Sequence, residues 1–211
     1  MLLLERQRCI FTFSVLIFCG LFYSVALAQK ADTFLIRSPE DAAHFDTRYL
    51  FLQKLPPGAT ESVDSIRTED YEKRFVRYHP DSTDCRYCVY WGKFYLKNEM
   101  ASPELLRDWI LKFYDASFID VYMFDTAGRQ FFYARTGKLV PARDKNVHSG
   151  FRANRVRFSL ADTAVFTVYF RYERVDGFEA EFKSFGLAPR DIYTLSEQLA
   201  FWRMDYFFMG F

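Results

Sequence analysis

The sequence predicts an all-β protein, an antiparallel two-sheet sandwich or jelly roll with a minor C-terminal helix that leads toward a membrane span. Between Tyr49 and Tyr172, apolar residues recur mostly at every second position in short runs, which is the period of a half-buried strand. Gly, Pro and Asp residues that form turns separate these runs. The aromatic content of 20% is high, and aromatic side chains favour strands. Little helix separates the runs, and parallel strands would need long crossovers, so antiparallel pairing is expected.

The N-terminus has the three parts of a secretory signal peptide. Arg6 and Arg8 precede an apolar run, and this run ends in the small-residue pattern Ala26-Leu27-Ala28. We therefore expect residues 1–28 to be a signal peptide that is cleaved after Ala28. Because the run has nearly the length that spans a bilayer, the alternative is an uncleaved anchor. In both cases the rest of the chain is expected to fold outside the cytoplasm.

The remaining chain has the length of one ordinary domain with a substantial core. We expect a lead-in segment over residues 29–46 and a single domain over residues 47–190. The 28 basic and 27 acidic residues give a net charge of +1, and no dense basic stripe interrupts this balance. Nucleic acid is therefore not an expected partner.

Residues 191–211 differ in character from the domain. Leu195, Leu199 and Trp202 recur at helical spacing, and the chain carries no charge after Asp205. Trp and Tyr are enriched where a helix enters a bilayer, so we expect a juxtamembrane helix and the start of a truncated transmembrane span. The alternative is an amphipathic helix that packs back on the sheet.

Nine strands are expected within the domain, with turn residues between them. They are 48–53, 75–78, 89–96, 108–114, 118–125, 130–136, 155–160, 165–172 and 178–185. The polar stretch 61–73 is expected to hold a turn or two of helix. Alternation predicts the following core residues: Phe94, Leu96, Leu111, Val121, Phe158, Val168 and Phe170.

Cys85 and Cys88 are the two cysteines that remain after the signal segment. Their spacing is that of a redox or zinc pair, but a strand follows where a redox pair usually opens a helix. A closed zinc site needs four ligands, and His79 is the only histidine nearby. A local disulfide in an oxidising compartment, or two inert thiols, are the favoured alternatives. No metal and no cofactor is expected.

Three segments of the domain occur in the order of a known family. They are Tyr90-Trp91-Gly92-Lys93-Phe94-Tyr95-Leu96-Lys97-Asn98, Asp108-Trp109-Ile110-Leu111-Lys112-Phe113 and Ile119-Asp120-Val121-Tyr122-Met123. The order resembles the type 2 extracellular domain of bacterial seven-transmembrane receptors with diverse intracellular signalling modules (7TMR-DISM). In that family a Trp followed by a basic residue and a Lys-Asn pair marks one strand, as at Trp91, Lys93 and Asn98. A strand that ends in Tyr follows, as at Val121 and Tyr122.

The resemblance covers Thr47 to Phe211 and implies a function in sensing. It implies a periplasmic jelly-roll domain that binds carbohydrate and signals through a membrane bundle, which here would be missing, to an output module. The expected partners are thus a saccharide and, through that bundle, the inner membrane. The alternative is a stand-alone exported carbohydrate-binding module. Gly92 departs from the bulky residue expected after the Trp, and Cys85 and Cys88 are not part of the family pattern.

Residues on one face of the predicted sheet have the chemistry of a saccharide site. Alternation places Trp91, Lys93 and Tyr95 on the face opposite the core, and it gives Tyr122 the same orientation on its own strand. A sugar needs a ring to stack on and donors for its hydroxyls, so these four residues are the predicted ligand-binding residues. The alternative is that they only cover the solvated outer face of a sandwich.

Catalysis is not expected. Asp115, Asp120 and Asp125 could form a carboxylate pair for glycoside hydrolysis, since carbohydrate is the expected ligand class. Carboxylates near strand ends are common, however, and no nucleophile or metal-ligand motif accompanies them. We therefore predict a binding protein rather than an enzyme.

Overall fold

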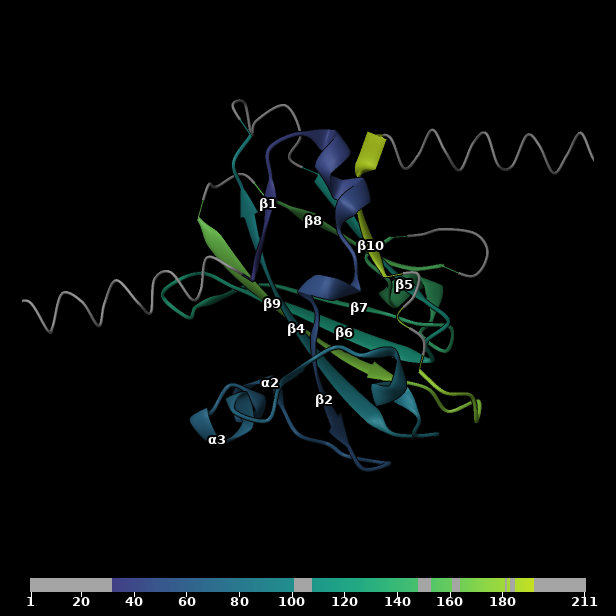
Figure 1. Cartoon of the computed structure of the whole chain (residues 1–211). Helices are drawn as coiled ribbons and strands as arrows, with labels where there is room; N and C mark the ends of the chain where they lie inside the picture. Colours follow the sequence, from purple (N-terminus) through teal and green to yellow (C-terminus); the bar gives the residue numbers. More distant parts are fainter. Residues whose placement is uncertain are drawn as a thin grey trace, which may run out of the picture. The chain divides into compact units, whose positions relative to one another are not determined.

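The computed structural model of the chain describes residues 32–100, 108–147, 153–160, 164–180, 182 and 185–191. They form a seven-stranded and a three-stranded sheet, and the pairings along both sheets are antiparallel (Figure 1). The predicted all-β class with two antiparallel sheets is confirmed. The expected signal peptide and residues 192–211 lie outside the described residues. Of the helices in the described part, none combines the length and apolar character that a bilayer crossing needs.

The larger sheet has a strand from late in the sequence at its centre. Its strands are β1 (Thr33–Ile36), β2 (Phe51–Leu55), β3 (Val76–Arg77), β4 (Val89–Asn98), β6 (Phe118–Phe124), β7 (Gln130–Thr136) and β9 (Val165–Glu173). Their order is β3-β2-β4-β9-β6-β7, and β1 also pairs with β4. The register joins Trp91 of β4 to Gln53 of β2 on one side and to Arg171 of β9 on the other.

The smaller sheet has the order β10-β5-β8. Its strands are β5 (Asp108–Tyr114), β8 (Ala153–Ser159) and β10 (Gly186–Pro189). Leu111 of β5 pairs with Val156 on one side and with Leu187 on the other. Strand β10 is an edge strand, where Pro189 needs no partner for a backbone N–H.

Short helical turns connect the strands. They are η1 (Pro39–His44), η2 (Thr47–Tyr49), α2 (Val63–Ile66), α3 (Glu69–Glu72), η3 (Pro80–Thr83) and η4 (Ala142–Asp144). The predicted helical turns within 61–73 are confirmed as α2 and α3. At the start of α2, the Ser62 hydroxyl accepts a hydrogen bond from the Ser65 backbone N–H, which is the usual N-cap arrangement.

The predicted strand over 178–185 is wrong, because the described residues of this range form no strand. The apolar residues that produced the prediction fill the interior instead. The Phe182 ring lies 4.8 Å from the Tyr172 ring, and the Phe185 ring lies 5.4 Å from that of Phe94. The expected lead-in segment contains a strand that the prediction missed, since β1 is part of the larger sheet.

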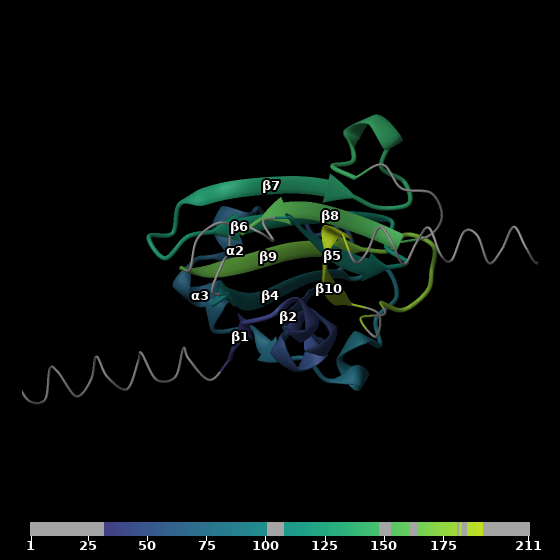
Figure 2. The ribbon, with the colours of Figure 1, turned by 90° about the horizontal axis from the view of Figure 1, so that it is seen from above.

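The main core lies between the inner faces of the two sheets. Figures 1 and 2 show β5, β8 and β10 as a layer over β4, β6 and β9. All of the predicted core residues are buried there and are at most 3% exposed: Phe94, Leu96, Leu111, Val121, Phe158, Val168 and Phe170. Alternation therefore assigned the faces of these strands correctly.

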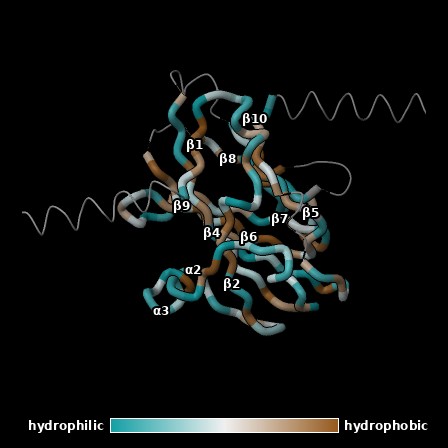
Figure 3. Tube along the Cα trace, in the orientation of Figure 1, coloured by the Kyte–Doolittle hydropathy of each residue, from teal (hydrophilic) through white to brown (hydrophobic). Residues whose placement is uncertain are grey.

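Residues 56–75, here called the cap, cover part of the outer face of the larger sheet. Figure 1 shows α2 and α3 on the side of this sheet away from β8 and β10, and Figure 3 shows α3 as mostly hydrophilic. The apolar side chains of the cap nevertheless form a second cluster with the sheet. Its buried members are Leu55, Ala59, Val63, Ile66, Val89, Trp91, Phe124 and Tyr169. The larger sheet is thus buried on both faces in this region.

Candidate functional site

The four predicted ligand-binding residues share the outer face of the larger sheet. Trp91, Lys93 and Tyr95 alternate along β4, and Tyr122 lies on β6. Strand β9 connects them, because Tyr169 pairs with Lys93 on one side and with Tyr122 on the other. The structure therefore places on one face of one sheet residues whose strands could not be shown to be neighbours from the sequence alone.

The cap changes what Trp91 and Lys93 can contact. Trp91 is 1% exposed, and Lys93 is 7% exposed. The Lys93 ammonium donates to the Glu72 carboxylate of α3, and its nitrogen lies 4.9 Å from the centre of the Phe75 ring. This differs from the open face that was expected. The reason is that the stretch 61–73, although polar overall, carries Val63 and Ile66, which are buried against the sheet.

Three rings extend from beneath the cap to solvent, and we call them the ring ladder: Trp91, Tyr122 and Tyr133. The centroids of Trp91 and Tyr122 are 5.9 Å apart with an interplanar angle of 26°. The centroids of Tyr122 and Tyr133 are 5.1 Å apart. Tyr122 is half-buried, whereas Tyr133 is 50% exposed. Tyr95 is also half-buried but lies on the β4 side of this face, where the Lys93 nitrogen is 5.6 Å from its ring centre.

Polar groups fix the exposed end of the ring ladder. The Tyr133 hydroxyl donates to Asp120 Oδ1 at 2.8 Å, and Arg135 Nε lies 3.4 Å from the same oxygen. Partial burial, and then the hydrogen bond to Asp120, raise the pKa of Tyr133 far above its usual value. Burial also raises the pKa of Tyr122. The single proton of the Tyr133 hydroxyl is donated to Asp120.

Tyr133 and Arg135 were missed by the sequence reasoning. The signal was present, because alternation along β7 turns Ala134 to the core and the residues on either side of it to the opposite face. The predicted strand was correct, but it was not tested for rings that continue the row begun by Tyr122.

The three carboxylates considered for hydrolysis lie before, within and after β6. Successive members are five residues apart, which is roughly 16 Å along a strand, whereas glycosidase carboxylates lie about 5–9.5 Å apart. Each also has partners. Asp120 binds Tyr133 and Arg135. Asp115 binds Lys138 and Arg174. A hydrogen bond from the Arg129 backbone N–H lowers the pKa of Asp125. The structure does not bring the three together.

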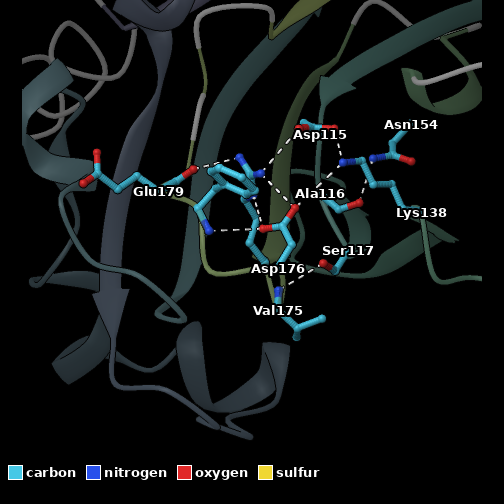
Figure 4. A network of polar contacts seen from close by, with 10 residues as sticks. Asp115, Ala116, Ser117, Lys138, Asn154, Val175, Asp176 and Glu179 are labelled. Atoms are coloured by element: carbon cyan, nitrogen blue, oxygen red, sulfur yellow. Dashed lines mark hydrogen bonds and ion pairs between the residues drawn. The ribbon is translucent and has the colours of Figure 1, made fainter.

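A second polar site surrounds Arg174, whose side chain is 5% exposed. Its guanidinium donates to both oxygens of Asp176 at 2.8 and 2.9 Å, to Asp115 at 3.3 Å and to the Glu179 carbonyl at 2.9 Å. Lys138 also pairs with Asp115 (Figure 4). The hydrogen bond from Arg174 lowers the pKa of Asp176, and the one to Asp176 raises that of Arg174.

This network lines a pocket of about 400 Å³. The lining residues are Arg86, Asp115, Lys138, Arg174, Asp176, Gly177, Phe178 and Glu179. Arg86 comes from a loop closed by a disulfide between Cys85 and Cys88, whose Cα atoms are 5.6 Å apart. Of the favoured alternatives for these two cysteines, the structure shows the disulfide.

Among the described residues, no group of three or more His, Cys, Asp or Glu side chains is arranged to hold a metal ion. In comparisons with known proteins, no family model, no curated protein and no solved structure matches this chain. The geometry of the two sites therefore carries the functional argument.

Proposed function

We propose that this chain is the periplasmic ligand-binding domain of a bacterial membrane signalling receptor and that it binds a saccharide or similar polyol at the ring ladder. The observation that carries the proposal is the half-exposed Tyr133 ring, which continues the row of Trp91 and Tyr122 and lies beside Arg135. The resemblance to 7TMR-DISM extracellular domains supplies the ligand class.

The exposed end of the ladder offers both kinds of contact that a sugar needs. The apolar face of a pyranose ring can stack on Tyr133, as rings do in saccharide sites. The side chain of Arg135 is 47% exposed and can donate to sugar hydroxyls. Asp120 is 7% exposed and accepts from Tyr133 while pairing with Arg135. We assign Asp120 the role of positioning these two side chains.

The buried predicted residues have supporting roles in this proposal. Trp91 packs behind Tyr122 and fixes the plane of its ring. Lys93 holds α3 on the sheet through Glu72. Tyr122 is half-buried, and it borders the ligand rather than stacking fully against it. Tyr95 lies on β4, with β9 and β6 between it and β7, and has no contact with the ligand in this proposal.

Two features support export. The predicted signal peptide would direct the chain across the membrane. The Cys85–Cys88 disulfide is a bond typical of oxidising compartments. The uncharged end of the chain after Asp205 supports the tether to a membrane bundle.

Calorimetric titration of the exported protein against a glycan panel tests the proposal. Replacing Tyr133 with Ala should weaken binding by about 1–3 kcal/mol, the effect of losing an interface anchor, with little change in stability. Phe131→Ala is the matched control, because Phe131 is 47% exposed on the same strand but lies outside the ladder. A panel without any binding glycan, or equal losses in both variants, would contradict the proposal.

A further inference from the structure

Four loops meet at the end of the sandwich where β6 begins. The Lys138 and Leu139 backbone N–H groups donate to the carbonyls of Ala116 and Ser117 at 2.9 and 3.1 Å. The Val175 N–H donates to the Ser117 hydroxyl at 3.0 Å. These contacts join the β5–β6 turn to the loops that follow β7 and β9. The disulfide loop 85–88 joins them, because a Cβ on Gly177 would lie 2.8 Å from the Tyr87 hydroxyl.

The backbone at this end is held in an unusual conformation. Tyr87 has a φ of 64° and Asp115 a φ of 51°, and among the described residues these are the two with positive φ that are not glycine. Such conformations persist only where the surroundings enforce them, and they cluster at functional sites. Here the Cys85–Cys88 disulfide constrains Tyr87, and the pairs to Lys138 and Arg174 constrain Asp115.

The charges inside the pocket are compensated except at Arg86. Arg174 and Lys138 are paired with Asp115 and Asp176. Arg86 is exposed and makes no ion pair with any residue in the described part of the chain. Figure 4 shows that Glu179 turns its carbonyl toward the network and its carboxylate away from it. The pocket therefore presents one free guanidinium, that of Arg86, beside a network whose other cations are paired, while the Glu179 carboxylate points away from that network.

One exposed ring, that of Phe178, lines the pocket together with Arg86. Tyr87 follows Arg86 and is 52% exposed, and Phe178 is 65% exposed. The Arg174 guanidinium lies 5.2 Å from the centre of the Phe178 ring, which holds one side of that ring against the network. An exposed ring in the same pocket as a cation is suited to a flat apolar body that carries a negative group.

We propose that this pocket binds a small organic acid, with one carboxylate paired to Arg86 and a flat or ring-shaped body against the Phe178 ring. Its volume of about 400 Å³ lies within the range of small-molecule sites. A guanidinium can bind a carboxylate through two parallel hydrogen bonds, which gives orientation as well as affinity. This site is separate from the ring ladder and does not depend on the saccharide proposal.

Titration of the full exported protein with three aromatic acids and their neutral amides tests the inference: benzoate, phenylacetate and cinnamate against benzamide, phenylacetamide and cinnamamide. At least one acid should bind saturably, and its amide should bind about tenfold more weakly or worse, because it cannot form a charged pair. Arg86→Gln should weaken binding of the acid about tenfold, and Arg86→Lys should weaken it less.

Arg129→Gln is the matched control, because Arg129 is an exposed arginine in the turn after β6, at the opposite end of that strand from Asp115. It should bind the acid as the unmodified protein does. Three results would overturn the inference: no saturable binding by any of the acids, equal binding of acid and amide, or equal binding by the Arg86→Gln and Arg129→Gln variants.

Discussion

Gly92 and Phe170 are partners in the β4–β9 register, and the Phe170 ring occupies the space that a side chain at position 92 would take. A Cβ on Gly92 would lie no more than 2.6 Å from three atoms of that ring. Phe170 is fully buried and packs 5.0 Å from the Phe113 ring. Packing across the two strands therefore explains why position 92 carries a glycine.

Gly92→Ala should destabilise the protein by about 1–3 kcal/mol, the usual cost of overpacking a dense core. Chemical denaturation measures this loss. Gly186→Ala is the control, because Gly186 also lies in a strand but a Cβ there would meet nothing within 4 Å. Equal stability of the two variants would show that the Phe170 ring can move aside without cost.

Phe94→Ala should cost about 3–5 kcal/mol in the free energy of unfolding, because the ring is fully buried between the sheets. Phe131→Ala removes the same ring from a half-exposed position and should cost less than about 1 kcal/mol. Urea titration of both variants makes the comparison. A loss below about 1 kcal/mol at Phe94 would mean that the inner and outer faces of β4 have been exchanged.

Glu72→Gln should loosen the cap. The carboxylate accepts hydrogen bonds from Lys93 and from the Tyr169 hydroxyl, so its replacement leaves a buried ammonium without its counter-charge. We expect a loss of about 1–3 kcal/mol and faster amide hydrogen exchange across residues 56–75. Glu69→Gln, on the same helix but with an 83% exposed side chain, should change neither. Unchanged exchange in the Glu72 variant would mean that apolar packing alone holds the cap.

The Arg174 network should contribute to stability in a pH-dependent way. The hydrogen bond from Arg174 holds the folded-state pKa of Asp176 below its unfolded value, so the folded protein releases this proton more readily. The contribution is therefore present above the ordinary Asp pKa near 3.9 and is lost as the pH falls through the folded value. Denaturation curves between about pH 6 and pH 3 should show a shallower decline for Asp176→Asn than for Asp70→Asn, an exposed carboxylate of α3. Equal slopes would contradict this linkage.

The exported protein should begin at Gln29, because cleavage is expected after Ala28. Intact-mass spectrometry of protein recovered from the periplasm measures the N-terminus directly. Recovery of the chain with residues 1–28 attached would instead support the uncleaved anchor.

Alternation predicted most strands of the two sheets, but it missed the short strands β1 and β10. The limits of β5 and β7 match the predicted strands, because each is a short run rich in aromatic and aliphatic residues between turn residues. Strand β1 was missed because four residues in a lead-in segment give too short a pattern. Strand β10 was missed because it begins with Gly186 and ends with Pro189, residues that ordinarily signal a turn.

The sites were harder to predict than the strands, because they depend on contacts between distant segments. Alternation placed Trp91 and Tyr122 on the correct face, yet the sequence contained no sign that α2 would cover one and leave the other half-exposed. The pocket at Arg86 takes its residues from four loops, and its rigidity comes from salt bridges that span about 60 residues, as between Asp115 and Arg174. No local spacing could have indicated it.

The order of the larger sheet also determines when it can assemble. Strand β9 is the last of the seven in sequence, yet it lies between β4 and β6 and, in the part of the chain that the structure describes, is the only strand that joins the β1–β4 half to the β6–β7 half. During synthesis, the two halves therefore have no shared hydrogen-bonded partner until Val165–Glu173 has left the ribosome. The central pairings are thus late and long-range, which slows folding and leaves the larger sheet incomplete through most of the chain's synthesis. A chain whose main sheet is incomplete is also easier to thread through a narrow translocation channel than a folded domain.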